Sequence, residues 1–433
     1  MKKVNVCDYK EFGQRAIQVA VDECAREGGG QVWIPGGEWE SGPIHLRSNI
    51  HLILDEKAVV RFSDRFSDYL PMVFTRWEGM ECWNYSPLIY ARDCENISIT
   101  GKGTFHGNGQ TWWHWKMLQQ EAANQLCYAQ ADGIPVEKRR FGTEKAALRP
   151  SFLQTISCKN VKLEGFTMID GPQWTIHPVY CDHVVVRGVT VLTHGHNTDG
   201  LNPDSCKNVW IEDCTFDTGD DCIAINSGMN EDGWRVNRPC ENIVIRNCTM
   251  NGGHGGLVIG SGMSAGVRNV TASGCKIKNT FWGIRIKSMR GRGGYVENVS
   301  FQDITLSDMS REMIQINMFY DTSTVVPRSK RPPVFRNICL EGIQGEGKGL
   351  VTAFHKYKVA TGLGEFVGFD IFAKIFRHRD FANAVRNTLL LNILDLIFSF
   401  PMPVILALLL NEIRVRWFKR TTQTLLYLPH FLS

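Results

Sequence analysis

Residues 206–211, CKNVWI, are one copy of a phrase that recurs between residues 94 and 340 of this chain. In each copy an Asn is followed by an apolar residue, any residue and a second apolar residue. A Cys often stands two positions before the Asn. This alternation is typical of a short strand with one buried face. Clear copies occupy residues 94–99, 158–163, 206–211 and 240–245, and weaker copies begin near residues 181, 268, 297 and 336.

The spacing of these copies predicts the fold. From residue 160 to residue 298 successive copies lie 23 to 34 residues apart, with Gly, Asn and Asp between them. Short strands at such intervals, separated by turn residues, are typical of a solenoid in which each coil stacks on the preceding one. We predict an all-β fold, a right-handed parallel β-helix, with the Asn residues forming a ladder in the turns and Ile or Val filling the interior.

The charge distribution excludes one class of partner. The chain has 433 residues and a formal net charge of +4. From residue 351 onward there are ten Lys or Arg and five Asp or Glu, so this tail carries +5 and the remainder −1. Without a basic domain, nucleic-acid binding is not expected.

The cysteines and the first residues predict a reducing compartment. All 14 Cys precede residue 340, many at the same position of the repeat, which favours small buried core residues. The sequence contains no CxxC pair, so we do not expect structural zinc. Residues 1–8 contain no apolar segment, so we expect no signal peptide and a cytoplasmic enzyme.

Two regions depart from the repeat. Residues 13–27 have the periodicity of an amphipathic helix, which we expect to cap the open end of the solenoid. Residues 64–90 and 107–150 interrupt the period, and the second stretch contains the aromatic cluster at residues 112–115, WWHW. Two interpretations of this cluster stay open, namely core packing and a sugar-stacking wall at the end of a groove.

Four polar phrases stand out within the repeat. One polar residue of each phrase lies 12 or 16 residues after the Asn of the preceding copy, or after His183, which replaces that Asn in one copy. Because stacked strands lie about 4.8 Å apart, residues at a similar phase of successive coils converge on one face. This convergence predicts an active site. The phrases are NTD with Asn197 and Asp199, GDD with Asp220 and Asp221, GHG with His254, and RIK with Arg285 and Lys287.

In order and spacing these four phrases resemble the signature of glycoside hydrolase family 28, the pectin-degrading polygalacturonase family, over about residues 1–349. The resemblance implies cleavage of α-1,4-galacturonosidic bonds by an inverting acid/base mechanism without a metal or other cofactor. It makes Asp220 the general acid, while Asp199 and Asp221 hold and deprotonate the attacking water. Crowded carboxylates are compatible with this division, because crowding raises at least one pKa and retains a proton near neutral pH.

The remaining candidates would bind substrate or influence the protonation of the general acid. His254 can hydrogen-bond a carboxylate and influence its protonation. Arg285 and Lys287 would hold the carboxylate of galacturonate, which a neutral sugar lacks. The substrate-binding candidates are Asn197, Arg285, Lys287, Tyr320, Trp174 and His177; for Trp174 and His177 a groove position and simple packing are equally compatible with the sequence.

Several functional alternatives remain. In the resembling family, insertions like those at residues 64–90 and 107–150 are associated with exo action, so an exo-acting enzyme is expected. A hydrolase of another pectic backbone, of the rhamnogalacturonan type, is the second interpretation. A β-helix that binds pectin without cleaving it is disfavoured by the complete set of carboxylates, and a non-catalytic, fused fragment of a sugar-uptake permease would rest on the tail alone.

The tail has a different character. Residues 388–410 carry only one charge, Asp395, and are long enough to span a bilayer, with cations following. Residues 366–388, 408–414 and 427–431 resemble the amino-terminal part of sugar ABC-transporter permeases. We therefore predict two domains, a β-helix hydrolase at 1–349 and a truncated, α-helical permease-like segment at 350–433 that associates with the membrane. The abrupt change suggests two neighbouring genes joined by deletion or by faulty assembly of the sequence.

Overall fold

The computed structural model describes residues 2–320, 325, 327–345, 355–358, 362–366, 386 and 389–390. By its internal contacts the chain divides into two compact units. One consists of Met1–Leu350 with Lys358–Gly362, and the other of Val351–Tyr357 with Leu363–Ser433. Each unit is described by itself, beginning with the larger.

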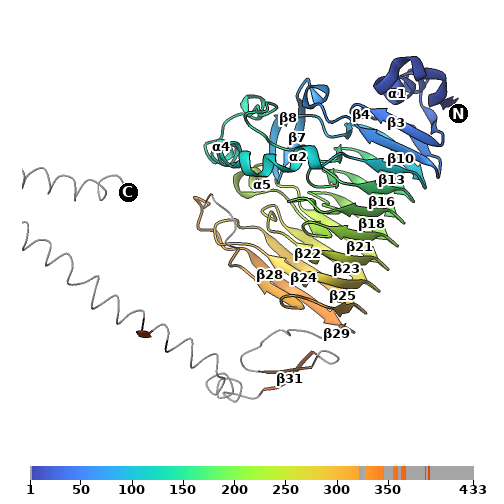
Figure 1. Cartoon of the computed structure of the whole chain (residues 1–433). Helices are drawn as coiled ribbons and strands as arrows, with labels where there is room; N and C mark the ends of the chain where they lie inside the picture. Colours follow the sequence, from blue (N-terminus) through green and yellow to red (C-terminus); the bar gives the residue numbers. More distant parts are fainter. Residues whose placement is uncertain are drawn as a thin grey trace, which may run out of the picture. The chain divides into compact units, whose positions relative to one another are not determined.

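The larger unit is a parallel β-helix built from three sheets whose strands stack coil upon coil (Figure 1). Neighbouring strands within each sheet run parallel. The first sheet follows the repeated Asn phrase and consists of β1 Lys2–Asn5, β2 Gly30–Ile34, β5 Ile50–Leu54, β10 Glu95–Gly101, β13 Lys159–Glu164, β16 Asp182–Arg187, β18 Lys207–Glu212, β21 Cys240–Arg246, β23 Val267–Ser273, β25 Tyr295–Gln302 and β28 Val334–Glu341.

The other two sheets form the remaining sides of each coil. The second consists of β3 Gly37–Ser41, β6 Ala58–Phe62, β11 Thr104–His106, β14 Thr167–Ile169, β17 Thr190–Thr193, β19 Thr215–Thr218, β22 Thr249–Ile259, β24 Lys276–Lys287, β26 Thr305–Ser307 and β29 Gln344–Gly345, with β20 Ile223–Ile225 pairing with β22 and β27 Ile314–Asn317 pairing with β24. The third consists of β4 Ile44–His45, β9 Ile89–Arg92, β12 Leu153–Ile156 and β15 Ile176–Val179.

The register confirms the predicted repeat. The first apolar residue of each Asn phrase pairs with its counterpart in the next coil, as in Val161 with Val184 and Val209 with Ile243. The Asn residues form the predicted ladder. Asn242 donates to Asn208 at 3.0 Å and accepts from Asn269 at 3.0 Å. Each ladder Asn has a positive φ, 58° at Asn242, which Asn tolerates better than most residues because its side chain hydrogen-bonds locally.

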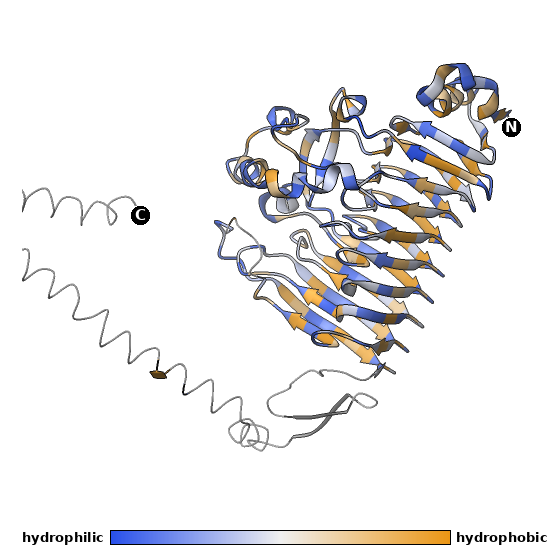
Figure 2. Ribbon diagram, viewed as in Figure 1, coloured by the Kyte–Doolittle hydropathy of each residue, from blue (hydrophilic) through white to orange (hydrophobic). Residues whose placement is uncertain are grey.

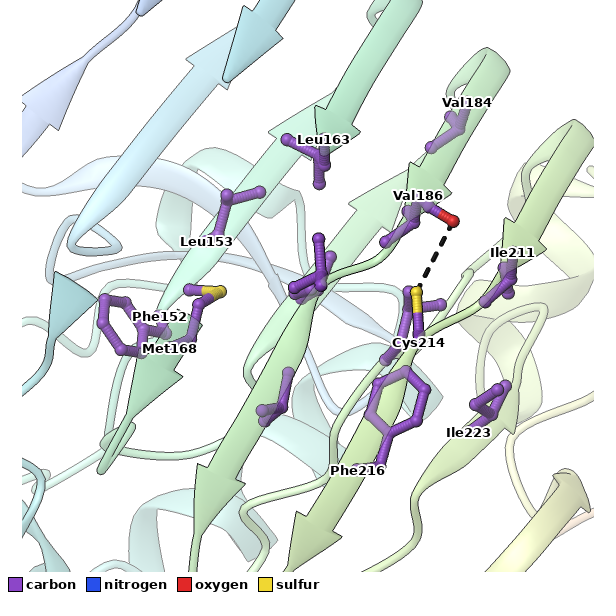
Figure 3. Packing of buried hydrophobic residues seen from close by; sticks show 14 of the residues in the cluster. Phe152, Leu153, Leu163, Met168, Val184, Val186, Ile211, Cys214, Phe216 and Ile223 are labelled. Atoms are coloured by element: carbon purple, nitrogen blue, oxygen red, sulfur yellow. Dashed lines mark hydrogen bonds between the residues drawn. The ribbon is translucent and has the colours of Figure 1, made fainter. Parts of the chain in front are cut away.

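The apolar residues fill the interior of the solenoid, as predicted. Alternating hydrophobic and hydrophilic bands run along the strands (Figure 2). In the close view of the interior, the side chains of Val186, Ile211 and Phe216 pack between neighbouring coils, and Cys214 Sγ contacts the Val186 carbonyl oxygen at 3.6 Å (Figure 3). The fourteen cysteines lie within the described residues, and all of them are free thiols.

The expected capping helix is present. The 3-10 segment η1 Val6–Arg15 leads into α1 Ala16–Arg26, and α1 buries Ile17, Val21 and Cys24 against the first coil. The helix is followed by Gly29, whose φ is 105°. A Cβ at Gly29 would lie 2.4 Å from the Asn49 carbonyl oxygen, so only glycine allows this close approach of helix and coil.

The two interruptions of the repeat form one structure beside the coils. Residues 64–90 contain η2 Phe66–Tyr69 and the antiparallel hairpin β7 Val73–Trp77 and β8 Met80–Asn84. Residues 107–150 contain α2 Gln110–Trp113, α3 Trp115–Leu118, α4 Gln120–Ala131 and η3 Val136–Lys138. Helix α4 packs against β8 and against α5 Asn230–Val236, and Figure 1 shows these elements grouped along one side of the solenoid.

The structure describes only a few residues of the second unit. Strands β30 His355–Lys358 and β31 Gly362–Phe366 pair in a two-stranded sheet. No helix among the described residues is long and apolar enough to cross a membrane. The predicted spanning segment at 388–410 lies outside the described residues, apart from Leu389 and Leu390.

Candidate active site

Coil stacking brings the predicted carboxylates together. Gly200 N donates to the Asp221 carbonyl oxygen at 2.9 Å, and His254 N donates to the Asp220 carbonyl oxygen at 3.0 Å. Asp199 and Asp221, and likewise Asp220 and His254, are therefore neighbours on adjacent coils. The predicted convergence of these phrases on one face is present in the structure.

The three carboxylates, called the trio below, are packed against one another. One oxygen from each of Asp199, Asp220 and Asp221 lies within 4.8 Å of the others. Asp199 is 4% exposed and Asp221 2%, whereas Asp220 is partly exposed. Asp220 is therefore the member of the trio that a substrate reaches most easily.

Each member of the trio has a different set of hydrogen bonds. Asp199 Oδ2 accepts from Asn202 Nδ2 at 2.9 Å. Asp220 Oδ1 accepts from the backbone N of Asp221 at 3.0 Å, and its Oδ2 accepts from Asn197 Nδ2 at 3.4 Å. The buried Asp221 Oδ1 has no hydrogen-bond partner among the described residues. The site thus leaves acceptor capacity unused, which is costly unless a water or a ligand fills it.

The electrostatics divide the trio. Burial, together with the charges of Asp220 and Asp221, raises the pKa of Asp199 well above its ordinary value. Burial also raises the pKa of Asp221, although Lys287 opposes this shift. Burial acts in the same direction on Asp220, but the hydrogen bond and charge of His254, the charge of Lys287 and the backbone N–H of Asp221 together outweigh it and lower the pKa of that carboxyl. Of the three carboxyls, Asp199 therefore retains a proton most readily.

His254 lies against Asp220 as the sequence predicts. Its Nδ1 is 3.2 Å from Asp220 Oδ1, and its ring stacks on Phe281 with 4.9 Å between ring centroids. The hydrogen bond to Asp220 raises the pKa of His254. The two shifts favour a protonated His254 beside an ionised Asp220.

The two cations of the RIK phrase differ in their surroundings. Lys287 Nζ donates to Asp221 Oδ2 at 2.7 Å, and the lysine is 6% exposed. Burial opposes its charge, but Asp221, Tyr320 and Asp220 together outweigh burial and raise the pKa of Lys287. Arg285 is partly exposed, stacks on Trp282 with 3.6 Å from Cζ to the ring centroid, and donates from Nε to Gln315 Oε1 at 2.8 Å. Since Arg285 forms no ion pair among the described residues, its charge is available to a ligand.

One pocket connects the trio with the inserted elements. Its volume is about 180 Å³, smaller than the roughly 300–1,000 Å³ of sites for drug-sized ligands, which suits a single sugar unit. Most predicted site residues line it: Asn197, Asp199, Asp220, Asp221, Lys287, Tyr320 and Trp174. His254 and Arg285 are not among the lining residues, although His254 touches Asp220 and Arg285 lies near Tyr320.

His177 does not fit the prediction that it binds substrate. It belongs to β15 and is 0% exposed. Its ring nitrogens lie near Gln154 Nε2 at 2.8 Å and Asp204 Oδ2 at 3.5 Å. Burial lowers the pKa of His177, so it is a neutral core residue. In sequence it stands three residues from Trp174, but the strand turns its side chain into the interior.

The aromatic cluster at residues 112–115 packs in the core, which resolves the two interpretations given above. Trp112 is 0% exposed and packs edge-on against Phe66, Tyr69 and Tyr85. The inserted region does reach the pocket, but it does so with polar residues such as Lys116. The alternative interpretation, a sugar-stacking wall, does not fit Trp112 and Trp115, which are 0% and 2% exposed.

Three residues that the sequence did not reveal also shape the site. Glu78, at the tip of the β7–β8 hairpin, and Arg292 both line the pocket. Arg149 holds Asn197 from outside the pocket by donating from Nη2 to Asn197 Oδ1 at 3.0 Å. Arg292 follows the RIK phrase by five residues within GRGG, a glycine-rich turn that could have indicated it. Glu78 and Arg149 come from the irregular insertions, where no periodic pattern gives a position in space.

The chain is similar to proteins of known family. The sequence profile of glycosyl hydrolases family 28 matches residues 135–357. A probable polygalacturonase of Vitis vinifera is 32% identical over 316 residues, which cover 70% of this chain and 59% of the relative. The crystal structure of a hyperthermoactive exopolygalacturonase from Thermotoga maritima superposes with a TM-score of 0.76 at 40% identity, covering 80% of this chain and 81% of that one.

A separate match concerns a transport protein. The polygalacturonan/rhamnogalacturonan transport system permease protein YteP of Bacillus subtilis (strain 168) is 45% identical over 87 residues, which cover 20% of this chain and 27% of the permease. The chain thus spans about 60% of the grape relative and about a quarter of the permease.

Proposed function

Because this chain belongs to glycosyl hydrolases family 28, we propose that it hydrolyses the α-1,4-galacturonosidic bonds of polygalacturonate and its oligosaccharides. One observation carries the proposal, namely that the trio and the buried cation Lys287 line a single pocket. Glycoside cleavage requires a proton donor and a carboxylate that activates water or attacks the sugar, and the trio offers both. Lys287 and the nearby Arg285 add positive charge that suits an acidic sugar.

In the proposed mechanism Asp220 protonates the leaving oxygen. Its partial exposure to the pocket supports this role, because the acid must reach the glycosidic oxygen. The three carboxyls of the trio share this proton, which Asp199 retains before substrate binds. An anionic sugar in the pocket raises the pKa of the adjacent Asp220, which draws the proton from Asp199 towards the leaving group. Asp199 and Asp221, the two buried members, then hold the attacking water.

Inversion at the anomeric carbon is part of the proposal. Carboxyl groups of inverting enzymes are typically about 6.5–9.5 Å apart, whereas those of retaining enzymes are about 5–5.5 Å apart. The nearest oxygens of the trio lie within 4.8 Å, a spacing nearer to that of retaining enzymes. We assign inversion because two buried carboxylates, rather than one, stand beside the acid and can hold a water between them. Proton NMR of the first product formed distinguishes the anomers directly.

Exo action is supported by the inserted elements that line the pocket. Helices α3 and α4 and the hairpin tip contribute Lys116, Ala123 and Glu78 to its lining. Elements that block one end of a cleft limit binding to a chain end. The similarity to the Thermotoga exopolygalacturonase agrees with this view.

The proposal is tested with the full chain by following product sizes from trigalacturonate and polygalacturonate. We expect galacturonate monomer from both substrates from the first time point. Mixed oligomers from the polymer would overturn exo action but not hydrolysis. Absence of cleavage by a folded sample that does cleave rhamnogalacturonan oligosaccharides would replace the substrate with the alternative pectic backbone, which the name of YteP also mentions.

For residues 350–433 we propose a permease-like segment, distinct from a hydrolase domain at residues 1–349. The 45% identity to YteP over 87 residues supports this assignment, and membrane association through residues 388–410 is part of it. Sequencing the locus across codons 349 and 350, together with its transcript, tests the predicted gene junction. Two separate reading frames would show an assembly artefact, and one continuous transcript would show a real fusion.

We propose a cytoplasmic location for the enzyme part. Its support is chemical: the fourteen free thiols include neighbours on adjacent coils, such as Cys181 and Cys206, which suits a reducing compartment. Fractionation of cells that express the full chain, followed by immunodetection, tests the location. Recovery of the full-length chain outside the cell would contradict it.

A further inference from the structure

The tip of the β7–β8 hairpin carries a residue that local backbone preferences do not explain. Trp77 pairs with Met80, so Glu78 and Gly79 form a two-residue turn, with φ values of 45° and 85°. Turns with two positive φ angles strongly favour Asn, Asp or Gly at the first position. Glu at that position costs about 1–2 kcal/mol. Residues that break a local rule without structural benefit are often functional.

The surroundings of Glu78 direct its carboxylate towards the pocket. Its Oε1 accepts from Gln173 Nε2 at 2.9 Å, and Gln173 is itself 2% exposed. Glu78 lines the pocket and forms no ion pair among the described residues. The hairpin tip is held in place because Met229 N donates to the Gly79 carbonyl oxygen at 3.1 Å. A fixed carboxylate with unused acceptor capacity therefore faces the cavity.

Cations border the same end of the pocket. Arg292 is 1% exposed, donates from Nη1 to Ser261 Oγ at 2.8 Å, and its buried Nε has no partner among the described residues. It lies 5.5 Å from the Tyr320 ring, measured from Cζ to the centroid, and forms no ion pair with a described carboxylate. Lys116 of α3 also lines this end. A buried, unpaired guanidinium is expensive unless an anion balances it.

We propose that this closed end binds the free, non-reducing terminus of an acidic sugar chain, with Glu78 accepting hydrogen bonds from the ring hydroxyls and Arg292 holding the carboxylate. This inference rests on the proposed hydrolysis of galacturonosidic bonds and adds what selects the chain end. In a 1,4-linked chain the hydroxyl at C4 is free only on the non-reducing terminal sugar. A carboxylate that must accept a hydrogen bond from that hydroxyl rejects internal sugars, because an internal sugar has a glycosidic bond at this position.

The charges explain how the sugar is oriented. Glu78 repels a sugar carboxylate and accepts hydroxyl protons, whereas Arg292 attracts the carboxylate and cannot accept a proton. Burial and the charge of Asp220 raise the pKa of Glu78, while Lys116 and Arg149 oppose the rise. Hydroxyl donors of a bound sugar oppose this rise, because they stabilise the ionised carboxylate. Together the two residues fix which edge of the ring faces the hairpin and which faces β24 and the turn that follows it.

The test compares two trisaccharides with the full chain. One is saturated trigalacturonate, and the other is its 4,5-unsaturated counterpart, which keeps the carboxylate of the terminal sugar but lacks the hydroxyl at C4. We expect the wild type to prefer the saturated substrate by at least about tenfold in kcat/KM, because a site built to bind a hydroxyl leaves a buried group unpaired with the analogue. Equal rates on both would overturn the inference and leave the proposed hydrolysis intact. No cleavage of either would instead overturn the proposed function.

Two variants with matched controls complete the test. Glu78→Gln should lose most of the preference for the saturated end, whereas Glu121→Gln, which changes an exposed residue of α4 outside the pocket, should keep it. Arg292→Gln should raise KM for trigalacturonate more than for its analogue methyl-esterified at the terminal sugar, and the exposed Arg290→Gln should not. A Glu78→Gln enzyme with the full wild-type preference would contradict the role of Glu78.

Discussion

Two buried carboxylates of one coil, Asp199 and Asp204, belong to clusters that differ in how their charges are balanced. Asp204 is 0% exposed, pairs with Arg76 at 3.0 Å, and accepts from the backbone N of Gly228 at 3.0 Å. Although burial opposes its charge, Arg76, His177 and the backbone N–H of Gly228 together outweigh burial and lower the pKa of Asp204. Five residues earlier, Asp199 lies beside two further carboxylates, and burial raises its pKa. The charge of Asp204 is balanced by Arg76, although Arg76 Nε and Nη2 have no hydrogen-bond partner among the described residues, whereas the three carboxylates of the trio share Lys287 and His254.

This difference separates a structural cluster from a functional one. Both clusters are buried, and both contain residues whose pKa values are shifted, so neither burial nor a shift alone identifies a site. The Asp204 cluster joins the inserted hairpin to the solenoid, because Arg76 belongs to β7. The trio leaves Asp221 Oδ1 without a partner and opens into a pocket. Unbalanced charge beside a cavity is the better sign of chemistry.

The largest effect is expected from Asp220→Asn. The variant removes the proposed acid, and loss of a general acid typically costs about 10²–10⁴ in rate. We expect kcat on trigalacturonate to fall by that factor, while the melting temperature stays unchanged or falls, because the folded pKa of Asp220 is lowered and its ionised form therefore stabilises the fold. Initial rates and thermal unfolding of the same sample measure both. Full activity would remove Asp220 from the proposed role.

The next largest effect concerns the structural cluster. Arg76→Met leaves Asp204 buried without its cation, and breaking a buried pair typically costs about 3–5 kcal/mol. Because the folded pKa of Asp204 is lowered, the stabilisation is present at neutral pH and is lost as the pH falls through that pKa. Denaturant unfolding at neutral and at acidic pH should therefore show a large loss that shrinks on acidification.

A double variant controls this second experiment. Arg76→Met combined with Asp204→Asn removes both charges, and it should be less destabilised than the sum of the two single variants. A strictly additive result would mean that the two residues are not energetically coupled.

A smaller effect, on pH dependence, is expected from His254→Gln. His254 lowers the pKa of Asp220 through its hydrogen bond, so its removal raises that pKa. If Asp220 is the acid, the alkaline limb of kcat/KM moves to higher pH in the variant. A full pH profile of both enzymes measures the shift. Movement of that limb to lower pH would contradict the link between His254 and Asp220.

The smallest effect is expected on the Asn ladder, far from either cluster. Asn242→Ala removes two side-chain hydrogen bonds and places Ala at a φ of 58°. We expect a loss of about 1–2 kcal/mol in the free energy of unfolding and no change in kcat. Asn242→Gly loses the same hydrogen bonds without the backbone strain, so it should be the more stable of the two variants if strain contributes.

Sequence reasoning succeeded where the solenoid repeats itself. The spacing of the Asn phrases predicted the stacked strands, and hence the meeting of Asp199, Asp220 and Asp221, because one coil places its residues by the same rule as the next. It failed for His177, since the sequence pattern did not show which way that strand faces. It also missed Glu78, whose partner Gln173 is 95 residues away, and Arg76, whose partner Ser205 is 129 residues away. Contacts between an irregular insertion and the coils have no periodic signal.

The most direct test of the contrast is the thermal unfolding of Asp199→Asn and Asp204→Asn at pH 7, measured side by side. Asp199 has a raised folded pKa, so its ionisation destabilises the fold as the pH rises above the unfolded carboxyl pKa, whereas ionised Asp204 stabilises it. We expect the melting temperature of Asp199→Asn to equal or exceed that of the wild type, and that of Asp204→Asn to fall by several degrees. Equal losses in both variants would contradict the distinction between a functional and a structural carboxylate cluster.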